Sequence, residues 1–214
     1  MISCVLFDFD GVIADTERSN GDYLAQALSF FGIPFTQEDR LSLIGTNGAG
    51  TLDRFLQRAD PPLTREQLAR VWERLGNTYE DSPLFPQPGL REWLRELGHQ
   101  GIRTGVVSST STKYIVTALN RMGFTGQFQV IVCGDMVKRP KPAPDSYQLA
   151  MSLLGLSPEE CLAIEDSPTG IQAARAAGLQ VVGYKGGSVE QDTRKAHWEV
   201  RSFQEIPSLP PFRG

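Results

Sequence analysis

The sequence predicts an α/β protein: a Rossmann-like parallel sheet with helices on both faces, interrupted by an inserted α-helical cap domain. Short apolar segments rich in β-branched residues alternate with segments in which apolar residues recur at three-and-four spacing. The apolar segments are nearly continuous, which is typical of parallel strands that are buried on both faces. The cap is predicted because no convincing strand occurs from about residue 16 to residue 85.

The strands and helices of the sheet domain follow one another in regular order. We expect strands in CVLFDF (4–9), RTGVVS (103–108), QVIVCG (129–134), CLAIED (161–166) and QVVGYK (180–185). We expect helices in GLREWLRELGHQG (89–101), STKYIVTALNRMG (111–123), DSYQLAMSLLG (145–155) and TGIQAARAAG (169–178). Each helical segment ends at a glycine, the residue most common just past a helix.

The inserted segment contains helix signals only. An amphipathic helix is predicted in SNGDYLAQALSFFG (19–32). Thr36 with Asp39, and Thr64 with Gln67, have the spacing of capping pairs at the starts of two further helices. The proline-containing segment LFPQPG (84–89) then predicts a hinge back to the sheet. We therefore assign residues 1–15 and 86–214 to an α/β core domain and residues 16–85 to a helical cap domain.

Composition excludes several classes of protein. The 214 residues carry a formal net charge of -4 with no basic block, which argues against a nucleic-acid partner. No apolar run approaches the roughly 20 residues that span a bilayer, and no signal peptide is evident, so we expect a cytoplasmic protein without a membrane partner. The three cysteines are widely spaced in or beside apolar segments and are interpreted as buried free thiols. Two isolated histidines exclude a histidine-rich metal site.

Polar residues gather where the predicted strands end, which is where open α/β sheets bind ligands. They are Asp8 and Asp10 after the first strand, Ser108 and Ser109 after the second, Lys141 after the third, and Glu165 and Asp166 after the fourth. Carboxylates, a hydroxyl pair and one cation are the groups needed for phosphoryl transfer with a hard divalent metal.

Asp8 and Asp10 raise a question of charge. If both lie in the strand, their side chains point the same way, and two carboxylates that close resist joint ionisation. A magnesium ion between Asp8 and Asp166 would relieve the repulsion and keep Asp8 ionised. Asp10 could then stay protonated part of the time, as a general acid must. The alternative is a pair of solvated loop aspartates, which the preceding apolar run disfavours.

The other residues at the strand ends also have simpler interpretations. Ser108 and Ser109 could bind an anion with the free amides of a helix start, or merely cap that helix. Lys141, held between prolines in RPKPAPDSY, could bind phosphate or be a solvated loop residue. Ser167 and Pro168 fit the first two positions of the last helix, but capping does not explain two adjacent acids after an apolar strand.

The segments DFDGVIADTE, VVSSTS, KPAPDSY and IEDSPTGIQAARAAG resemble, in order, the four motifs of the haloacid dehalogenase-like hydrolases. The resemblance covers essentially the whole chain. It is closest to the branch with a helical cap after the first strand, which includes phosphoglycolate phosphatase-like enzymes, sugar-phosphate phosphatases and β-phosphoglucomutase. The first and fourth motifs are highly specific, whereas the second is weak by itself.

The resemblance implies a role for each site residue. Asp8 would attack phosphorus and become an aspartyl-phosphate, and Asp10 would protonate the leaving alcohol and then activate water. Mg²⁺ would be bound by the Asp8 carboxylate, the Asp10 backbone carbonyl and Asp166, with Glu165 acting through a bound water. The remaining implied ligands of the phosphoryl group are Ser108, the amide of Ser109, and Lys141. Gly11 would allow the turn into the cap.

The cap is the least legible part of the sequence. LIGTNGAGTLDRFL (43–56) is spaced like a P-loop, but Thr51 stands where lysine is required and no strand precedes it. The resemblance implies a substrate-facing loop here instead, with Asn47 and Arg54 as candidate contacts; helix capping and a solvated face are their alternatives. β-Phosphoglucomutase uses a cap histidine and a cap arginine where this chain has Asn20 and Gly48.

The sequence thus predicts a Mg²⁺-dependent phosphatase that acts on a small phosphorylated metabolite, with a sugar phosphate as the expected substrate. The absence of the mutase histidine and arginine favours hydrolysis, but a β-phosphoglucomutase-like phosphotransferase is an alternative function. A further alternative is a non-catalytic protein that binds a phosphometabolite. A receiver domain is disfavoured because receivers are shorter, lack a cap and have no acid two residues after the phosphorylated aspartate. We expect a monomer or a weak homodimer.

Overall fold

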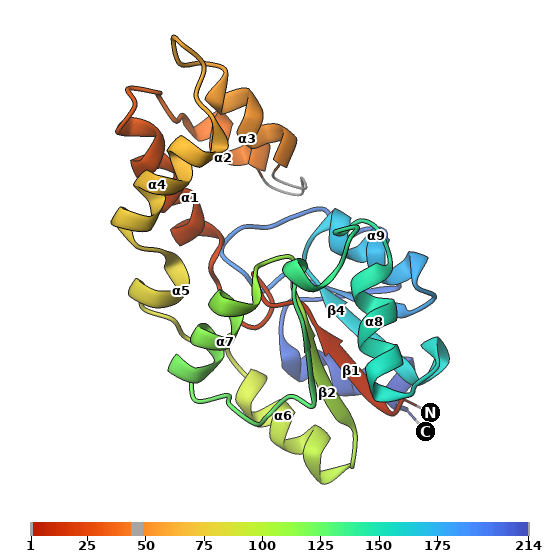
Figure 1. Cartoon of the computed structure of the whole chain (residues 1–214). Helices are drawn as coiled ribbons and strands as arrows, with labels where there is room; N and C mark the ends of the chain where they lie inside the picture. Colours follow the sequence, from red (N-terminus) through yellow and green to blue (C-terminus); the bar gives the residue numbers. More distant parts are fainter. Residues whose placement is uncertain (1, 44–48, 214) are drawn as a thin grey trace.

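The protein is a six-stranded sheet with helices packed on both faces and a group of helices inserted after the first strand (Figure 1). The computed structural model describes residues 2–43 and 49–213. The strands are β1 (Cys4–Phe7), β2 (Arg103–Val107), β3 (Val130–Val132), β4 (Cys161–Glu165), β5 (Gln180–Tyr184) and β6 (Trp198–Val200). They lie in the order β3-β2-β1-β4-β5-β6, and every neighbouring pair is parallel. The predicted α/β fold class is confirmed.

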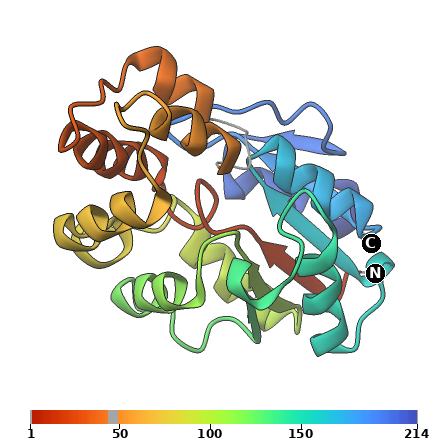
Figure 2. The same cartoon turned by 45° about the horizontal axis from the view of Figure 1, so that its top comes forward.

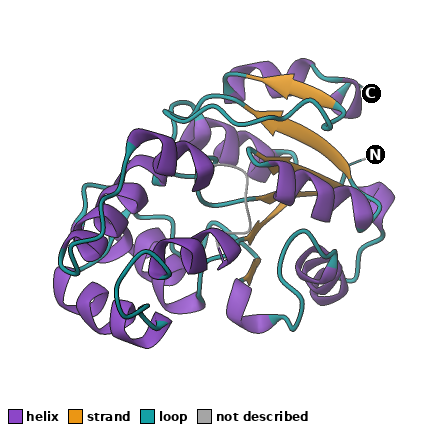
Figure 3. Ribbon diagram, turned by 90° about the horizontal axis from the view of Figure 1, so that it is seen from above, coloured by secondary structure: helices purple, strands orange, loops and turns teal. Residues whose placement is uncertain are grey.

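Alternation along β1 explains why both faces of the sheet must be covered. Val5 and Phe7 belong to one buried apolar cluster, and Cys4 and Leu6 belong to another. The first cluster includes side chains of α6 (Leu90–His99) and α7 (Thr112–Arg121), and the second includes side chains of α8 (Asp145–Leu154) and α9 (Pro168–Ala176). Figure 3, seen from above, shows helices on both sides of the strands.

The insertion between β1 and α6 is helical in its described residues. It comprises α1 (Glu17–Ser29), α2 (Gln37–Leu43), α3 (Ala49–Leu56), α4 (Arg65–Leu75) and α5 (Thr78–Asp81). It has its own apolar cluster, which includes Leu24, Leu28, Phe55 and Leu68. The insertion lies to one side of the sheet domain in Figures 1 and 2, beyond the carboxyl end of β1. The domain limits at residues 15/16 and 85/86 stay a prediction.

Both predicted capping pairs form in the insertion. Thr64 Oγ1 accepts a hydrogen bond from Gln67 N (3.2 Å), and Gln67 Oε1 accepts one from Thr64 N (2.8 Å). Asp39 Oδ2 accepts from Thr36 N (2.8 Å), and Thr36 Oγ1 accepts from Asp39 N (3.2 Å). These bonds satisfy amides that a helix start would otherwise leave without partners.

The sheet has one strand more than the sequence predicts. The sixth, β6, is only three residues long, and its sequence WEV gives too short a pattern to distinguish from a polar connection. The chain after it returns to the sheet, and Phe203 and Ile206 are fully buried in the same cluster as Phe7. Among the residues described, no helix is both long and apolar enough to cross a membrane.

Candidate active site

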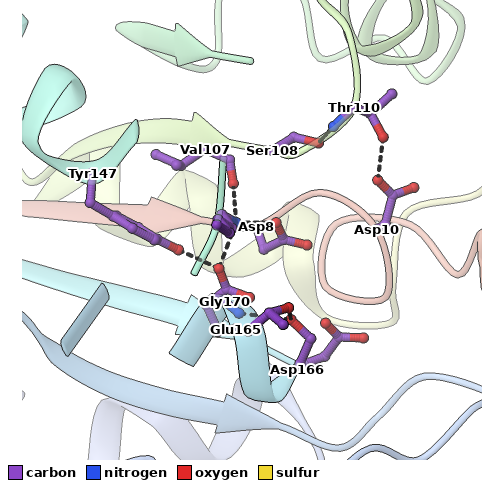
Figure 4. Close-up of polar contacts among 12 residues, drawn as sticks. Asp8, Asp10, Val107, Ser108, Thr110, Tyr147, Glu165, Asp166 and Gly170 are labelled. Carbon is purple, nitrogen blue, oxygen red and sulfur yellow. Dashed lines mark hydrogen bonds and ion pairs between the residues drawn. The ribbon is translucent and has the colours of Figure 1, made fainter. Parts of the chain in front are cut away.

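The side chain of Asp8 lies at the carboxyl end of β1 and meets a buried lysine. Lys141 Nζ is 2.6 Å from Asp8 Oδ1 and 2.6 Å from Glu165 Oε1, and it also donates to the carbonyl of Val107 (2.8 Å). Figure 4 shows Asp8, Glu165 and Asp166 near one another, at the ends of adjacent strands. All of these side chains are buried. Lys141 is therefore a buried ion-pair partner of Asp8 rather than a solvated loop residue.

Asp8, Glu165 and Asp166 form a group that can hold a metal ion. One carboxylate oxygen from each lies within 4.8 Å of the others. Carboxylate oxygens are hard ligands of the kind that Mg²⁺ prefers. When ionised, the three carboxylates outnumber the single Lys141 ammonium by two charges, which a divalent cation would balance. Glu165 Oε2 is buried and has no hydrogen-bond partner among the described residues, so this oxygen is available to a metal ion or to a water bound to it. The residues present fit Mg²⁺.

Burial and like charge shift the pKa values of Asp8 and Asp166 in the same direction. Burial raises the pKa of Asp8 well above its usual range; Lys141 opposes this, and Glu165 and Asp10 add to it. Burial also raises the pKa of Asp166, with further contributions from Asp8 and Glu165. Burial alone would lower the pKa of Lys141, but Asp8 and Glu165 outweigh it and the net shift is upward. Without a cation, the fold therefore disfavours full ionisation of its acids.

Asp10 lies apart from this group, contrary to the expectation that it continues the strand. The strand β1 ends at Phe7, and Asp10 makes only an isolated bridge to Ala14, so the strand alternation does not extend to it. Its Oδ1 accepts hydrogen bonds from Thr16 Oγ1 (2.5 Å) and Tyr79 OH (2.7 Å), and its Oδ2 accepts one from Thr110 Oγ1 (3.0 Å). In Figure 4 the Asp10 carboxylate points toward Thr110. The two aspartates thus have different surroundings. The sequence also predicts that they differ, but because two carboxylates side by side would resist joint ionisation.

Two glycines allow the acids to approach the backbone. Gly11 has φ of 80°, a conformation that residues with a side chain rarely adopt, and a Cβ there would collide with Asp166 Oδ2. A Cβ at Gly170, in the first turn of α9, would collide with the Glu165 carboxylate. The predicted cap of α9 is present, because Ser167 Oγ accepts from Gly170 N (3.1 Å) with Pro168 at the first helical position.

The hydroxyl pair after β2 divides between two positions. Ser108 is buried, and its Oγ accepts a hydrogen bond from Thr110 N (3.0 Å), so it shapes the loop between β2 and α7. Ser109 is one of the residues that line a cavity of about 220 Å³, which Asp8, Asp10 and Lys141 also line. This cavity is the place where a phosphoryl group can reach Asp8.

Of the two predicted cap contacts, the structure describes only Arg54, which is not brought to this cavity. Asn47 lies outside the described residues, as does Gly48. Arg54 lies on α3 with an exposed side chain, and it is not among the residues that line the 220 Å³ cavity. Asn20, by contrast, does line the cavity, and its Nδ2 donates to Tyr79 OH (3.3 Å).

Several polar partners were missed from the sequence. Tyr147 OH donates to Glu165 Oε1 (2.6 Å), and Gln191 Nε2 donates to Asp166 Oδ2 (3.0 Å). Thr110 follows Ser108 and Ser109 directly, so its position after β2 was a usable signal. Tyr79, in the short helix α5, contacts Asp10, and Gln191 lies in the loop after β5; no local pattern marks either residue. Tyr147 lies on the buried face of α8, where it resembles an ordinary core residue.

A second cavity opens next to the first. Its volume is about 440 Å³, and it lies between α1, α2 and α4 of the insertion and the loop after β5. Glu17 and Asn20 line both cavities. Burial raises the pKa of Glu17 to about 7, with Asp10 and Asp15 adding to the shift. A molecule with one end at Asp8 can therefore extend past Glu17 into a larger chamber.

Comparisons with known proteins agree with this geometry. Residues 5–184 match the family model described as Haloacid dehalogenase-like hydrolase. The chain is 35% identical over 193 residues to Protein CbbY of Cereibacter sphaeroides, covering 85% of this chain and 84% of that protein. It is 33% identical over 187 residues to Fructose-1-phosphate phosphatase YqaB of Escherichia coli (strain K12), covering 83% and 94%. The crystal structure of CbbY from Rhodobacter sphaeroides in complex with phosphate superposes with a TM-score of 0.83 at 31% identity, covering 96% of each chain.

Proposed function

Because the chain belongs to the haloacid dehalogenase-like hydrolase family, we propose that it is a Mg²⁺-dependent phosphatase that hydrolyses a small phosphomonoester through an aspartyl-phosphate on Asp8. One observation carries the proposal: Asp8 and Asp10 line the same cavity but have different partners. The Asp8 carboxylate accepts from Lys141, whereas the Asp10 carboxylate accepts from hydroxyl groups. A nucleophile and an acid/base need such different surroundings.

The reaction proceeds in two displacements. Asp8 Oδ forms a bond to phosphorus as the bond from phosphorus to the ester oxygen breaks, and the leaving oxygen takes the proton of the Asp10 carboxyl group. Asp10, now a carboxylate, accepts a proton from water as the water oxygen attacks phosphorus and the bond from Asp8 to phosphorus breaks. One difficult step thereby becomes two easier ones.

Lys141 and the loop after β2 hold the phosphoryl group. The Lys141 ammonium is a point charge that reduces the negative charge around Asp8 as an anionic substrate arrives. The backbone amide of Ser109, a residue that lines the cavity, binds a phosphoryl oxygen, and the neighbouring Ser108 hydroxyl group, which accepts from Thr110 N, donates its own proton to that oxygen. Both residues lie between β2 and α7. The start of α7 supplies backbone amides that have no hydrogen-bond partner within the helix.

Mg²⁺ would be held by the carboxylates of Asp8 and Asp166 and the backbone carbonyl of Asp10, with Glu165 acting through a bound water. When bound, it supplies charge neutralisation at the phosphoryl oxygens and at the carboxylates. The surrounding contacts orient these ligands: Gln191 donates to Asp166, and Tyr147 and Lys141 donate to Glu165.

The substrate we propose is a sugar phosphate. The 440 Å³ chamber can hold the leaving group. The side chains that line it include Glu17, Asn20, Arg40 and Trp72, which provide hydrogen-bonding groups and one aromatic face. Hydroxyl groups can both donate to and accept from such a lining. The relative YqaB is described as a fructose-1-phosphate phosphatase, which is consistent with this choice of substrate class.

Hydrolysis is favoured over mutase chemistry by Asn20. A mutase must turn a bisphosphate over without losing its phosphoryl group to water, and the resemblance places a mutase histidine at this position. The Asn20 amide lines the cavity and donates to Tyr79 OH, but it cannot exchange a proton as an imidazole does.

A panel of phosphorylated sugars assayed for released phosphate, with Mg²⁺ and with a chelator, tests the proposal. We expect Mg²⁺-dependent turnover of at least one sugar phosphate. Isomerisation of β-glucose 1-phosphate is measured alongside, and we expect none. Inertness toward every ester with Mg²⁺ present would contradict the proposal.

A further inference from the structure

Tyr79 comes from the inserted helices, yet its hydroxyl group lies in the active site. It belongs to α5 and is 7% exposed. Its OH is 2.7 Å from Asp10 Oδ1 and 3.2 Å from Thr110 Oγ1, and it accepts a hydrogen bond from Asn20 (3.3 Å). None of the sequence motifs includes this residue. Its position needs an explanation, because a phenylalanine would fill the same apolar space without adding a polar group.

The ring of Tyr79 is held from several sides. It stacks on Tyr114 of α7 with a centroid distance of 5.5 Å and an interplanar angle of 20°. Its backbone carbonyl accepts from Arg121 Nη1 (2.8 Å), and its backbone amide donates to Asn77 Oδ1 (2.9 Å). These contacts to the insertion and to α7 hold the ring and the backbone of Tyr79 in place. The side chain therefore loses little further conformational entropy when its hydroxyl group bonds to Asp10.

Tyr79 is the donor in its contact with Asp10. A phenol is protonated at neutral pH, whereas a carboxylate oxygen can only accept. The phenol keeps its proton and donates to Asp10 Oδ1, the same oxygen that accepts from Thr16. Thr110 donates to Oδ2. Both oxygens of Asp10 are thus oriented, by donors from α5, from the start of α1 and from the loop after β2.

We propose that Tyr79 is a positioning residue that aims the Asp10 carboxyl group at the leaving oxygen of the substrate. The inference rests on the proposed function and deepens it. Asp8, Asp10 and Tyr79 line the same 220 Å³ cavity, and Tyr79 holds Asp10 on the side of the insertion. The leaving group extends to that side when phosphorus lies against Asp8. In the transfer step Asp10 gives its proton to the leaving oxygen, while Tyr79 keeps its own proton throughout.

Comparing two kinds of ester separates positioning from general damage. An alkyl ester such as a sugar phosphate needs a proton at its leaving oxygen, whereas p-nitrophenolate leaves without one. In Tyr79→Phe, we expect kcat/KM for the sugar phosphate to fall about tenfold or more, as part of the ~100-fold or larger effect of general acid catalysis. We expect kcat/KM for p-nitrophenyl phosphate to change by less than about threefold.

Tyr114→Phe is the matched control, because it keeps the stacked ring pair and removes a hydroxyl that makes no hydrogen bond to Asp10. It should leave both values of kcat/KM close to those of the wild type. A double variant gives a second readout: if Tyr79 acts through Asp10, adding Tyr79→Phe to Asp10→Asn should cost no further activity toward the sugar phosphate.

Equal losses for both esters in Tyr79→Phe, no loss for either, or a faster variant would overturn the positioning role. Additive losses in the double variant would overturn it as well. These outcomes are distinct from failure of the proposed function itself, in which the wild-type protein would hydrolyse neither ester with Mg²⁺ present.

Discussion

Lys141 Nζ lies 2.6 Å from Asp8 Oδ1 in a buried contact that joins the loop after β3 to the end of β1. The ammonium also contacts Glu165, so one cation faces two carboxylates with almost no solvent. Breaking a buried pair leaves an uncompensated charge, which costs more than the pair itself contributes. The contact therefore links the stability of the core to the chemistry proposed at Asp8.

Replacing Lys141 by methionine should destabilise the metal-free protein by roughly 3–5 kcal/mol, the usual cost of removing one partner of a buried pair. Urea unfolding in the presence of a chelator measures this change. Lys138→Met is the matched control, because Lys138 is an exposed residue of the same loop. The control should lie within about 0.5 kcal/mol of the wild type. Equal midpoints for the two variants would contradict the buried charge network.

Replacing Asp166 by asparagine should stabilise the metal-free protein at pH 7 by roughly 1–3 kcal/mol, because a buried charge is removed. An acid with a raised folded-state pKa stabilises the folded protein below its unfolded pKa, and that contribution is lost as pH rises through the raised value. The advantage of the variant should therefore shrink toward pH 4. Thermal unfolding from pH 4 to pH 8 in chelator measures it; a variant less stable throughout would refute the account.

Mg²⁺ should reverse the order of these two proteins. Binding stabilises the wild type by about 2.7 kcal/mol at a concentration of 100 times Kd. The asparagine variant loses one carboxylate of the set formed by Asp8, Glu165 and Asp166, so its unfolding should respond little to Mg²⁺. Calorimetric titration with Mg²⁺ alone gives the same information without an activity assay. Equal Mg²⁺ affinity in both proteins would remove Asp166 from the metal site.

The ion pair between Asp39 and Arg58 should stabilise the inserted helices. Asp39 Oδ1 lies 2.6 Å from Arg58 Nη2 and Oδ2 lies 2.8 Å from Arg58 Nη1; the Asp39 carboxylate is buried, whereas the Arg58 side chain is 40% exposed. The hydrogen bonds from Arg58 lower the pKa of Asp39, so this contribution exists above the unfolded pKa of about 3.9 and is lost as pH falls below it. Asp39→Asn should cost roughly 1–3 kcal/mol at pH 7 and somewhat less at pH 3, because the contribution shrinks gradually as pH falls from the unfolded pKa toward the lowered folded-state pKa.

Hydrogen exchange of amides in α1 and α2, together with urea unfolding, measures the effect of Asp39→Asn. Asp53→Asn is the control, because Asp53 forms an exposed ion pair with Arg65 and exposed pairs contribute little. A variant at Asp39 that matches the control at both pH values would show that the pair between Asp39 and Arg58 does not stabilise these helices.

Most of the fold could be read from the sequence because its strands are apolar and its helices are regularly amphipathic. The segment CLAIED predicted β4, and both Glu165 and Asp166 lie at its end as expected. The same argument missed β6, since three residues cannot show a period. It also extended the first strand to Phe9, whereas the chain leaves the sheet after Phe7 and turns at Gly11.

The grouping of Asp8, Lys141, Glu165 and Asp166 was predictable because parallel strands bring their carboxyl ends to one edge. The surroundings of Asp10 were not predictable, because they depend on where the insertion packs against the sheet domain. Tyr79 reaches Asp10 across 69 positions of sequence, and its local pattern gives no sign of that contact. The same holds for Gln191, whose contact with Asp166 depends on the path of an irregular loop.

Asp10→Asn should distinguish the two chemical steps. Its kcat for a sugar phosphate should fall about 100-fold or more, because both protonation of the leaving group and activation of water need a carboxyl group. With p-nitrophenyl phosphate, the first step should survive and the second should be slow, so a burst of p-nitrophenol should precede the steady state. Rapid-mixing absorbance measures this burst. Unchanged steady-state rates would remove Asp10 from the mechanism.

The central claim, that Asp8 carries the phosphoryl group, is tested most directly by trapping the intermediate in that same variant. Asp10→Asn protein is mixed with p-nitrophenyl phosphate and Mg²⁺, quenched, and treated with borohydride, which reduces an acyl phosphate to an alcohol. Mass spectrometry then locates the reduced residue. We predict reduction at position 8, dependent on substrate and on Mg²⁺. Reduction at another carboxylate, or a burst of p-nitrophenol with no reduced residue, would contradict the account.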